Sequence, residues 1–182
     1  MATTDNSALL CVQTDAGLAK ILSAQRNGLD GVISHIGFGT EAYEPSRSQT
    51  ELRDERARIS LGGGEKADPH TLILQGLLDS SPQFWCREIG IFLDDGTMIA
   101  VWSHPTKPRW YKTTGISVAV AYILTFEALP ADSVTINVTG PSVNLVMAGP
   151  IAQMSAEIIR LQRRAVESEN ARLIPEIQTM WS

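Results

Sequence analysis

Cysteine is scarce in this chain, and long apolar runs are missing. The 182 residues include only Cys11 and Cys86, which lie far apart and each in an apolar context, so we expect free buried thiols in place of a disulfide. No stretch reaches the ~18 consecutive apolar residues of a membrane span. Free thiols fit synthesis in the cytosol. The amino terminus lacks the basic region and apolar run of a secretion signal, so we expect no such signal.

The charge balance argues against nucleic acid as a partner. Lysine and arginine number 15 against 20 acidic residues, which gives a net charge of −5, and no cluster of basic residues is available to follow a phosphate backbone. The length predicts one globular domain with an appendage.

The common catalytic motifs are also missing. The chain has no G-x-S-x-G, H-E-x-x-H or C-x-x-C motif. Residues 62–66 (GGGEK) differ from a phosphate-binding loop because no Ser or Thr follows the lysine. The histidines, His35, His70 and His104, are isolated, without a second ligand type at helical or hairpin spacing. We therefore expect no enzymatic activity, no cofactor and no metal site.

The sequence of residues 84–103, FWCREIGIFLDDGTMIAVWS, predicts a β-hairpin around which the fold is organised. Apolar residues alternate along both arms, and Asp95-Gly96 between them suits a two-residue turn with positive φ. Arg87 and Glu88 interrupt the apolar run. Because an isolated buried ion is costly, we predict that these two residues form a structural ion pair.

The other elements predict a mainly antiparallel β body. Helical spacing follows a possible Thr14 or Asp15 cap and ends near Gly28. Apolar patterns predict strands within residues 32–38, 71–78, 116–126 and 134–138. Residues 39–51 predict a surface loop anchored by Tyr43, and residues 52–61 fit either a strand or a helical turn. The fold class is α+β, with a short amino-terminal helix on an antiparallel β-rich body and a protruding carboxy-terminal helix.

The carboxy-terminal segment predicts that helix. From Ile151 there is no glycine, and no proline before Pro175, which leaves about 25 helical residues or roughly 37 Å. About two heptads carry an apolar seam, formed by Ile151, Met154, Ile158, Leu161 and Ala165. The helix either packs on its own body or forms a coiled coil between copies, and its length favours self-association.

Two groups of apolar side chains are candidate binding surfaces. Ile177, Met180 and Trp181 follow the expected helix and are candidate contacts for another protein. The aromatic residues Trp85, Trp102, Trp110 and Tyr111 either anchor the core or stack on sugars. A carbohydrate-binding module that contacts host surface glycans is therefore the alternative function.

Several motifs, in this order, resemble one known family. They are TDAGLAK (14–20), ISHIGFG (33–39), YEPS (43–46), QTEL (49–52), REIGIF (87–92) and DGTMIAV (95–101). Over about residues 10 to 138 the chain resembles the amino-terminal domain of bacteriophage tail-collar fibre proteins. R-E-I-G-I-F followed by D-G-T-x-I-A carries most of this resemblance.

The resemblance implies a virion structural protein, made in the host cytoplasm, that docks a tail fibre on the baseplate, usually as a trimer. On this basis residues 1–148 are expected to form a baseplate-attachment domain and residues 149–182 an oligomerisation or docking segment. The implied partners are baseplate proteins, another tail fibre protein and further copies of the chain. Family members commonly continue into a long shaft and a receptor-binding tip, whereas this chain ends at Ser182, so an adaptor or short-fibre role is expected.

Overall fold

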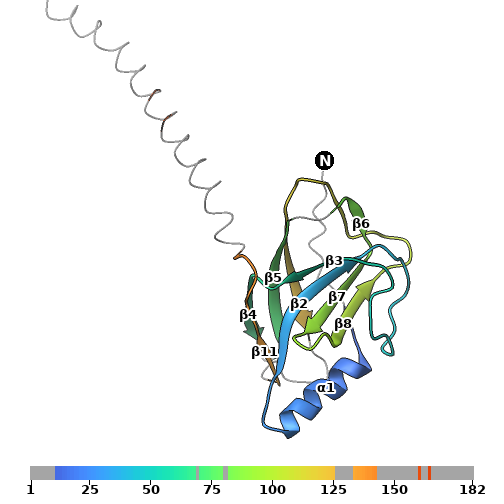
Figure 1. The fold of residues 1–182 in the computed structure, drawn as a ribbon, viewed down its shortest axis with the longest axis vertical. Coiled ribbons are helices and arrows are strands. Elements are labelled where there is room, and N and C mark those ends of the chain that lie inside the picture. The colour runs from blue at the N-terminus through green and yellow to red at the C-terminus, as the bar shows by residue number, and fades with distance from the viewer. Residues whose placement is uncertain are drawn as a thin grey trace, which may run out of the picture. The chain divides into compact units, whose positions relative to one another are not determined.

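The computed structural model describes residues 11–68, 70–79, 82–125 and 133–142, together with Arg160 and Arg164. These residues form an antiparallel β-rich body with one short helix near its start, α1 (Asp15–Arg26) (Figure 1). No helix in the described part of the chain is long and apolar enough to cross a membrane. Apart from Arg160 and Arg164, the expected carboxy-terminal helix lies outside the described residues.

The larger sheet has six strands. Its order is β1 (Val12–Gln13), β8 (Met98–Ser103), β7 (Glu88–Leu93), β2 (Gly31–Gly39) and β11 (Val134–Ile136), and β3 (Glu55–Ser60) also pairs with β2. β11 pairs with the first half of β2 and β3 with its second half. β11 runs parallel to β2, whereas the other pairs in this sheet are antiparallel. The expectation of an antiparallel body therefore holds except at this edge.

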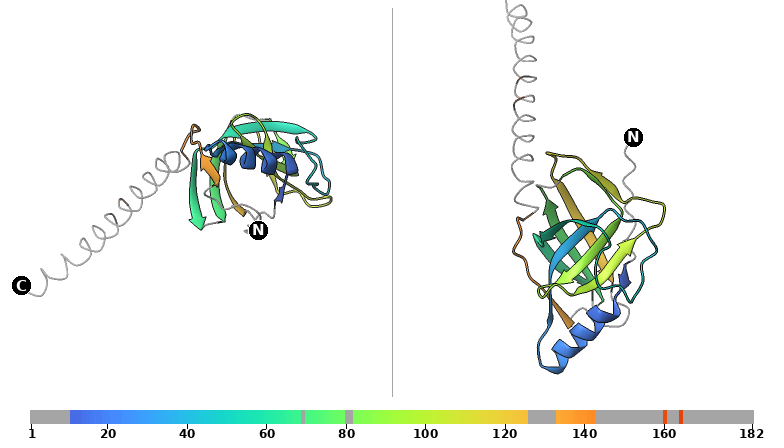
Figure 2. Two further views of the ribbon diagram at one scale, coloured as in Figure 1. Left: turned by 90° about the horizontal axis from the view of Figure 1, so that it is seen from below. Right: turned by 45° about the vertical axis from the view of Figure 1, so that its right-hand side comes forward.

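A smaller sheet completes the core. Its order is β10 (Val118–Thr125), β5 (Thr71–Leu78) and β4 (Gly63–Asp68), and a separate ribbon pairs β6 (Phe84–Cys86) with β9 (Trp110–Lys112). The chain passes from β3 through Leu61 and Gly62 into β4, so the two sheets are directly connected (Figure 2). Buried side chains of both sheets meet in one cluster, which includes Ile33, Phe38 and Ile91 from the larger sheet and Leu74 and Tyr122 from the smaller.

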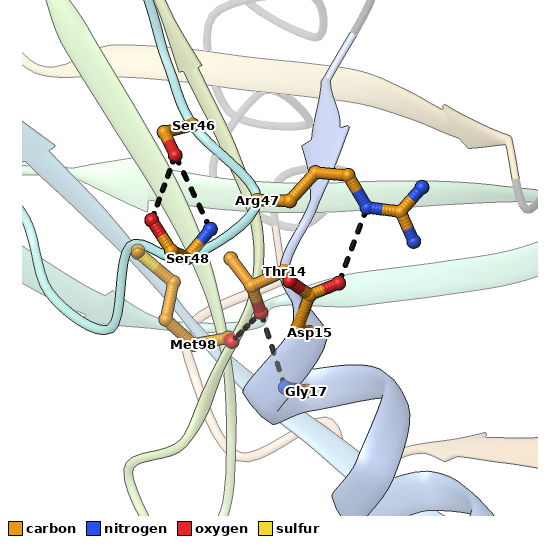
Figure 3. Close-up of polar contacts among 7 residues, drawn as sticks. All are labelled: Thr14, Asp15, Gly17, Ser46, Arg47, Ser48 and Met98. Atoms are coloured by element: carbon orange, nitrogen blue, oxygen red, sulfur yellow. Dashed lines mark hydrogen bonds and ion pairs between the residues drawn. The ribbon is translucent and has the colours of Figure 1, made fainter.

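The start of α1 is fixed to β8 and to the loop after β2. The Thr14 hydroxyl accepts a hydrogen bond from the backbone N–H of Gly17 at 3.1 Å and donates one to the carbonyl oxygen of Met98 (Figure 3). The backbone carbonyl oxygen of Arg47 accepts the backbone N–H of Asp15 at 2.8 Å. The Nε atom of Arg47 lies 3.2 Å from Oδ1 of the Asp15 carboxylate. Thr14 is thus the helix cap, as the sequence allowed.

The predicted hairpin is present as β7 and β8, but its turn is longer than expected. Leu93 and Thr97 are joined by a 2.9 Å backbone hydrogen bond, which leaves three residues between them, and Gly96 is the one with positive φ (87°). This is the geometry of a three-residue loop in which only the last position needs glycine. Asp95 instead accepts the backbone N–H of Thr97 and pairs with Lys20 of α1 at 2.8 Å.

A buried carboxylate lies at the other end of the hairpin. Glu88 is fully buried, and its two oxygens accept the Tyr43 hydroxyl at 2.7 Å and the backbone N–H groups of Arg53 at 2.9 Å and Asp54 at 2.7 Å. Gly39 lies opposite Glu88 in the sheet, and a side chain there would collide with Oε1 of Glu88. The carboxylate is therefore the internal acceptor for a loop that has no strand partner.

That loop, residues 40–54, is held along its length. Tyr43 is only 6% exposed, which agrees with its predicted role as the anchor of the loop. Burial, together with the hydrogen bond to Glu88, raises the pKa of its hydroxyl. The Arg53 guanidinium lies 3.9 Å above the Tyr43 ring, and Ser103 accepts the Tyr43 backbone N–H at 3.2 Å. The Thr40 hydroxyl donates to the Asp54 carboxylate and closes the loop at its base.

Most of the other predicted strands are confirmed. β2, β5 and β10 fall within or close to the expected ranges, and both cysteines are free, with Cys86 buried and Cys11 half-buried. Residues 52–61, which the sequence left open, contain strand β3. Two of the three glycines at 62–64 begin β4.

We expect Glu88→Gln to lower the free energy of unfolding by about 1–3 kcal/mol, because an amide has one acceptor oxygen where the carboxylate has two, and a buried backbone N–H then loses its partner. Chemical denaturation measures this change.

The matched control is Glu55→Gln, the same chemical change at an exposed glutamate that pairs with Arg58 at the surface. It should change stability by less than about 0.5 kcal/mol. Equal effects at the two positions would contradict the structural role of Glu88.

The Lys20–Asp95 pair should make stability depend on pH. The hydrogen bond from Lys20 is the main reason that the pKa of Asp95 falls from its ordinary 3.8 to about 2. Because the folded-state pKa is the lower one, the stabilisation is present above about pH 4 and is lost as the pH falls towards 2. Thermal unfolding at pH 7, 4 and 2 should therefore show a smaller decrease for Asp95→Asn than for the unchanged chain. Identical pH profiles would contradict the pair.

Candidate functional site

An open hollow lies beside the loop 40–54, where β6 begins. Its volume is about 510 Å³, and its lining combines two arginines, two aromatic rings and uncharged groups: Thr40, Arg56, Pro82, Gln83, Phe84, Trp85 and Arg87. We call it the Arg87 hollow. Its volume is within the range of sites that bind small ligands or a few side chains.

The backbone of Arg87 is fixed between β2 and β8. Its N–H donates to the carbonyl oxygen of Gly39 at 2.9 Å, and its carbonyl oxygen accepts the Ser103 hydroxyl at 3.0 Å. Its side chain is half-buried and lines the hollow, whereas the next side chain, Glu88, is fully buried. The site therefore has at its wall an arginine whose backbone is fixed.

The predicted ion pair between Arg87 and Glu88 is not present in the structure. Neighbouring residues of extended backbone point their side chains in opposite directions, so adjacency in sequence does not bring these charges together. Among the described residues, Glu88 is satisfied by Tyr43 and by the backbone of Arg53 and Asp54. Glu88 keeps the structural role that we expected for the pair, while Arg87 belongs to the surface.

The second arginine of the hollow is already paired. Arg56 donates from Nη2 and Nε to Oδ2 of Asp54, at 2.7 and 3.1 Å. Asp54 also accepts the Thr40 hydroxyl, and that bond is the largest cause of the lowered pKa of this carboxyl group. The positive charge of Arg56 is thus largely compensated within the chain.

Two aromatic rings stand on the outer face of the β6–β9 ribbon. Trp85 and Tyr111 are directly opposite each other, with 49% and 42% of their surfaces exposed and ring centroids 4.8 Å apart. The planes of the rings are inclined by 49°. Cross-strand aromatic pairs of this kind are rigid apolar surfaces.

The other candidate aromatic residues face inward. Trp110 packs edge-on against Phe38 at 5.3 Å and donates from Nε1 to the Tyr122 hydroxyl at 3.0 Å. Trp102 is half-buried against the hydrophobic core. Of the four aromatic residues considered for binding, Trp85 and Tyr111 are therefore the two that are available at the surface.

A buried lysine, which no sequence pattern indicated, supports this ribbon. Lys112 is 0% exposed, and its ammonium group donates to the carbonyl oxygens of Thr113, at 3.1 Å, and Ile116. These bonds close the turn that contains Gly115, whose φ is 76°. Ile116, in the same turn, is 58% exposed.

The described residues include no group of three or more His, Cys, Asp or Glu side chains that could hold a metal ion. His35 shares a 2.6 Å hydrogen bond with Ser34, and His104 accepts backbone N–H groups in a turn. Burial raises the pKa of the Cys86 thiol, which keeps it protonated and weakly nucleophilic. The hollow offers the Arg87 side chain and the exposed Trp85 ring, with Tyr111 beside Trp85 on the ribbon.

The remaining predicted site residues lie outside the described part of the chain. These are the seam residues Ile151, Met154, Ile158, Leu161 and Ala165, and the terminal residues Ile177, Met180 and Trp181. Their assignment to self-association and docking stays a prediction.

Comparison with known proteins agrees with the resemblance seen in the sequence. No curated protein matches the chain at a significant level. The family model of the phage tail-collar fibre protein N-terminal domain matches residues 6–146, which include the described β body and its Glu88 network. The chain therefore belongs to the phage tail-collar fibre protein family, and it is a structural component of a phage tail.

Proposed function

We propose that this chain attaches tail fibres to the baseplate as an oligomeric adaptor or short fibre. The β body is the part that docks on another tail protein, and the carboxy-terminal segment joins copies of the chain and contacts the next component. The observation that carries this proposal is the family match over residues 6–146.

The geometry of the body supports an attachment role. Loop 40–54 is fixed by a buried carboxylate and by the capped start of α1, so its surface is preorganised and loses little conformational entropy on binding. Exposed aromatic rings and a guanidinium, which are enriched at protein–protein contacts, stand beside this loop.

Self-association rests on the sequence of the carboxy-terminal segment. The seam from Ile151 to Ala165 has the 3-4 spacing of a coiled coil, and charged residues at 157, 160, 164 and 167 fall outside it. A trimer would provide three equivalent bodies for attachment and one stalk for the next component.

The attachment proposal is tested on purified tail particles from a phage that lacks this chain. We expect these particles to lack fibres, and to bind the added chain and then fibre protein, as seen by co-sedimentation and electron microscopy. Particles that already carry the chain are the control and should take up little more. Fibres on particles that lack the chain would contradict the proposal.

Self-association is tested by light scattering at high micromolar concentration. The full chain should have three times the mass of one copy, and Ile158→Asp with Leu161→Asp should reduce it to one copy, because charges in the seam cost more than the apolar contacts provide. Gln153→Asp with Ala156→Asp, on the opposite side of the expected helix, should leave the mass unchanged. A monomeric full chain would overturn the stalk.

A further inference from the structure

The two arginines of the Arg87 hollow differ in whether their charge is paired with a carboxylate of the chain. Arg56 is held by Asp54 through two hydrogen bonds. The guanidinium of Arg87 forms no hydrogen bond or ion pair with the residues that the structure describes, although its backbone is fixed on both sides. A half-buried cation in this state gains most from a carboxylate that arrives from outside the chain.

The aromatic pair supplies an apolar surface next to this charge. Trp85 belongs both to the lining of the hollow and to the exposed pair with Tyr111. Lys112, Phe84 and Cys86 on the inner face of the same ribbon are buried, so the outer rings stand on a fixed base. Tryptophan, tyrosine and arginine are the residue types that most often dominate the energy of protein–protein contacts.

The inclination of the rings favours a protein over a sugar. Stacking on a pyranose needs a flat aromatic face, and two rings inclined by 49° with centroids 4.8 Å apart do not form one flat surface. An apolar side chain of a protein loop has no such requirement. Arg87 brings a positive charge without a partner among the described residues to this face, and such a charge favours an acidic group on the partner protein.

We propose that the Arg87 hollow is the contact through which the body docks on another tail protein, and that it accepts an acidic loop of that protein. A carboxylate of the loop bonds to the Arg87 guanidinium, and a neighbouring apolar side chain lies against Trp85 and Tyr111. This inference rests on the proposed attachment function, and it specifies the surface and the chemistry of the partner.

The test uses purified tail particles that lack this chain, with variants of the full chain added in a co-sedimentation assay. Arg87→Glu should weaken binding by at least about tenfold, because the acidic loop is then repelled, and Trp85→Ala and Tyr111→Ala should each weaken it by about tenfold. All three side chains are at least partly exposed, so an unchanged thermal unfolding curve should verify that each variant folds.

Matched controls change the same properties elsewhere on the body. Arg26→Glu makes the same change in net charge at the exposed end of α1, and Leu29→Ala removes a 65% exposed apolar side chain. Both should bind within about twofold of the unchanged chain. Weakening by these controls equal to that of the hollow variants would overturn the assignment of the site.

A photo-crosslinking residue at position 85 identifies the partner surface. We expect it to capture a tail-protein segment that contains Asp or Glu, and a basic or uncharged segment, or a second copy of this chain, would overturn the proposal. Binding to host surface polysaccharide that is lost in Trp85→Ala would also overturn it, in favour of a glycan contact.

The binding assay distinguishes failure of the docking site from failure of the attachment function. If the unchanged chain fails to bind particles, the attachment function itself fails. If the unchanged chain binds and the hollow variants bind equally well, only the docking site fails.

Discussion

The carboxylate of Glu88 is the constraint on which the rest of the body depends. Burial of a carboxylate is costly, and here three hydrogen bonds offset that cost by satisfying both oxygens. The donors come from loop 40–54, so the same bonds that solvate the charge also fix the loop. Gly39 leaves the space that the carboxylate needs, and Arg87 is held by the backbone next to it. The exposed face of the Arg87 hollow is a consequence of this internal arrangement.

The sequence predicted those parts of the fold that depend on local patterns. Alternation and a glycine in the turn predicted the hairpin β7–β8, and a cap followed by helical spacing predicted α1. Local patterns could not predict the hydrogen-bond donors to Glu88, because these donors lie 34 to 45 residues away in the sequence. Adjacent opposite charges suggested a pair, but extended backbone separates neighbouring side chains. The parallel direction of β11 could not be predicted either, because it depends on which edge of the distant strand β2 is free.

The candidate site shows the same division. The aromatic residues were recognised as anchors or binding groups, yet strands of three residues are too short to tell which ring faces the core. Tyr111 faces outward because it pairs with the exposed Trp85 of β6, and its neighbour Trp110 therefore faces inward. A lysine such as Lys112 is expected at the surface from sequence alone. Its burial is explained only by the folded turn, whose carbonyl oxygens accept its ammonium group. The geometry of the ribbon leaves Trp85 and Tyr111 exposed together on this face.

The most direct measurement is a reconstruction of the assembled phage tail at side-chain resolution. We expect Glu88 to keep its three hydrogen bonds, and Trp85, Tyr111 and Arg87 to be covered by another tail protein whose carboxylate lies within hydrogen-bonding distance of the guanidinium. A tail in which the body contacts its neighbours through other surfaces, with this face left in solvent, would contradict that expectation.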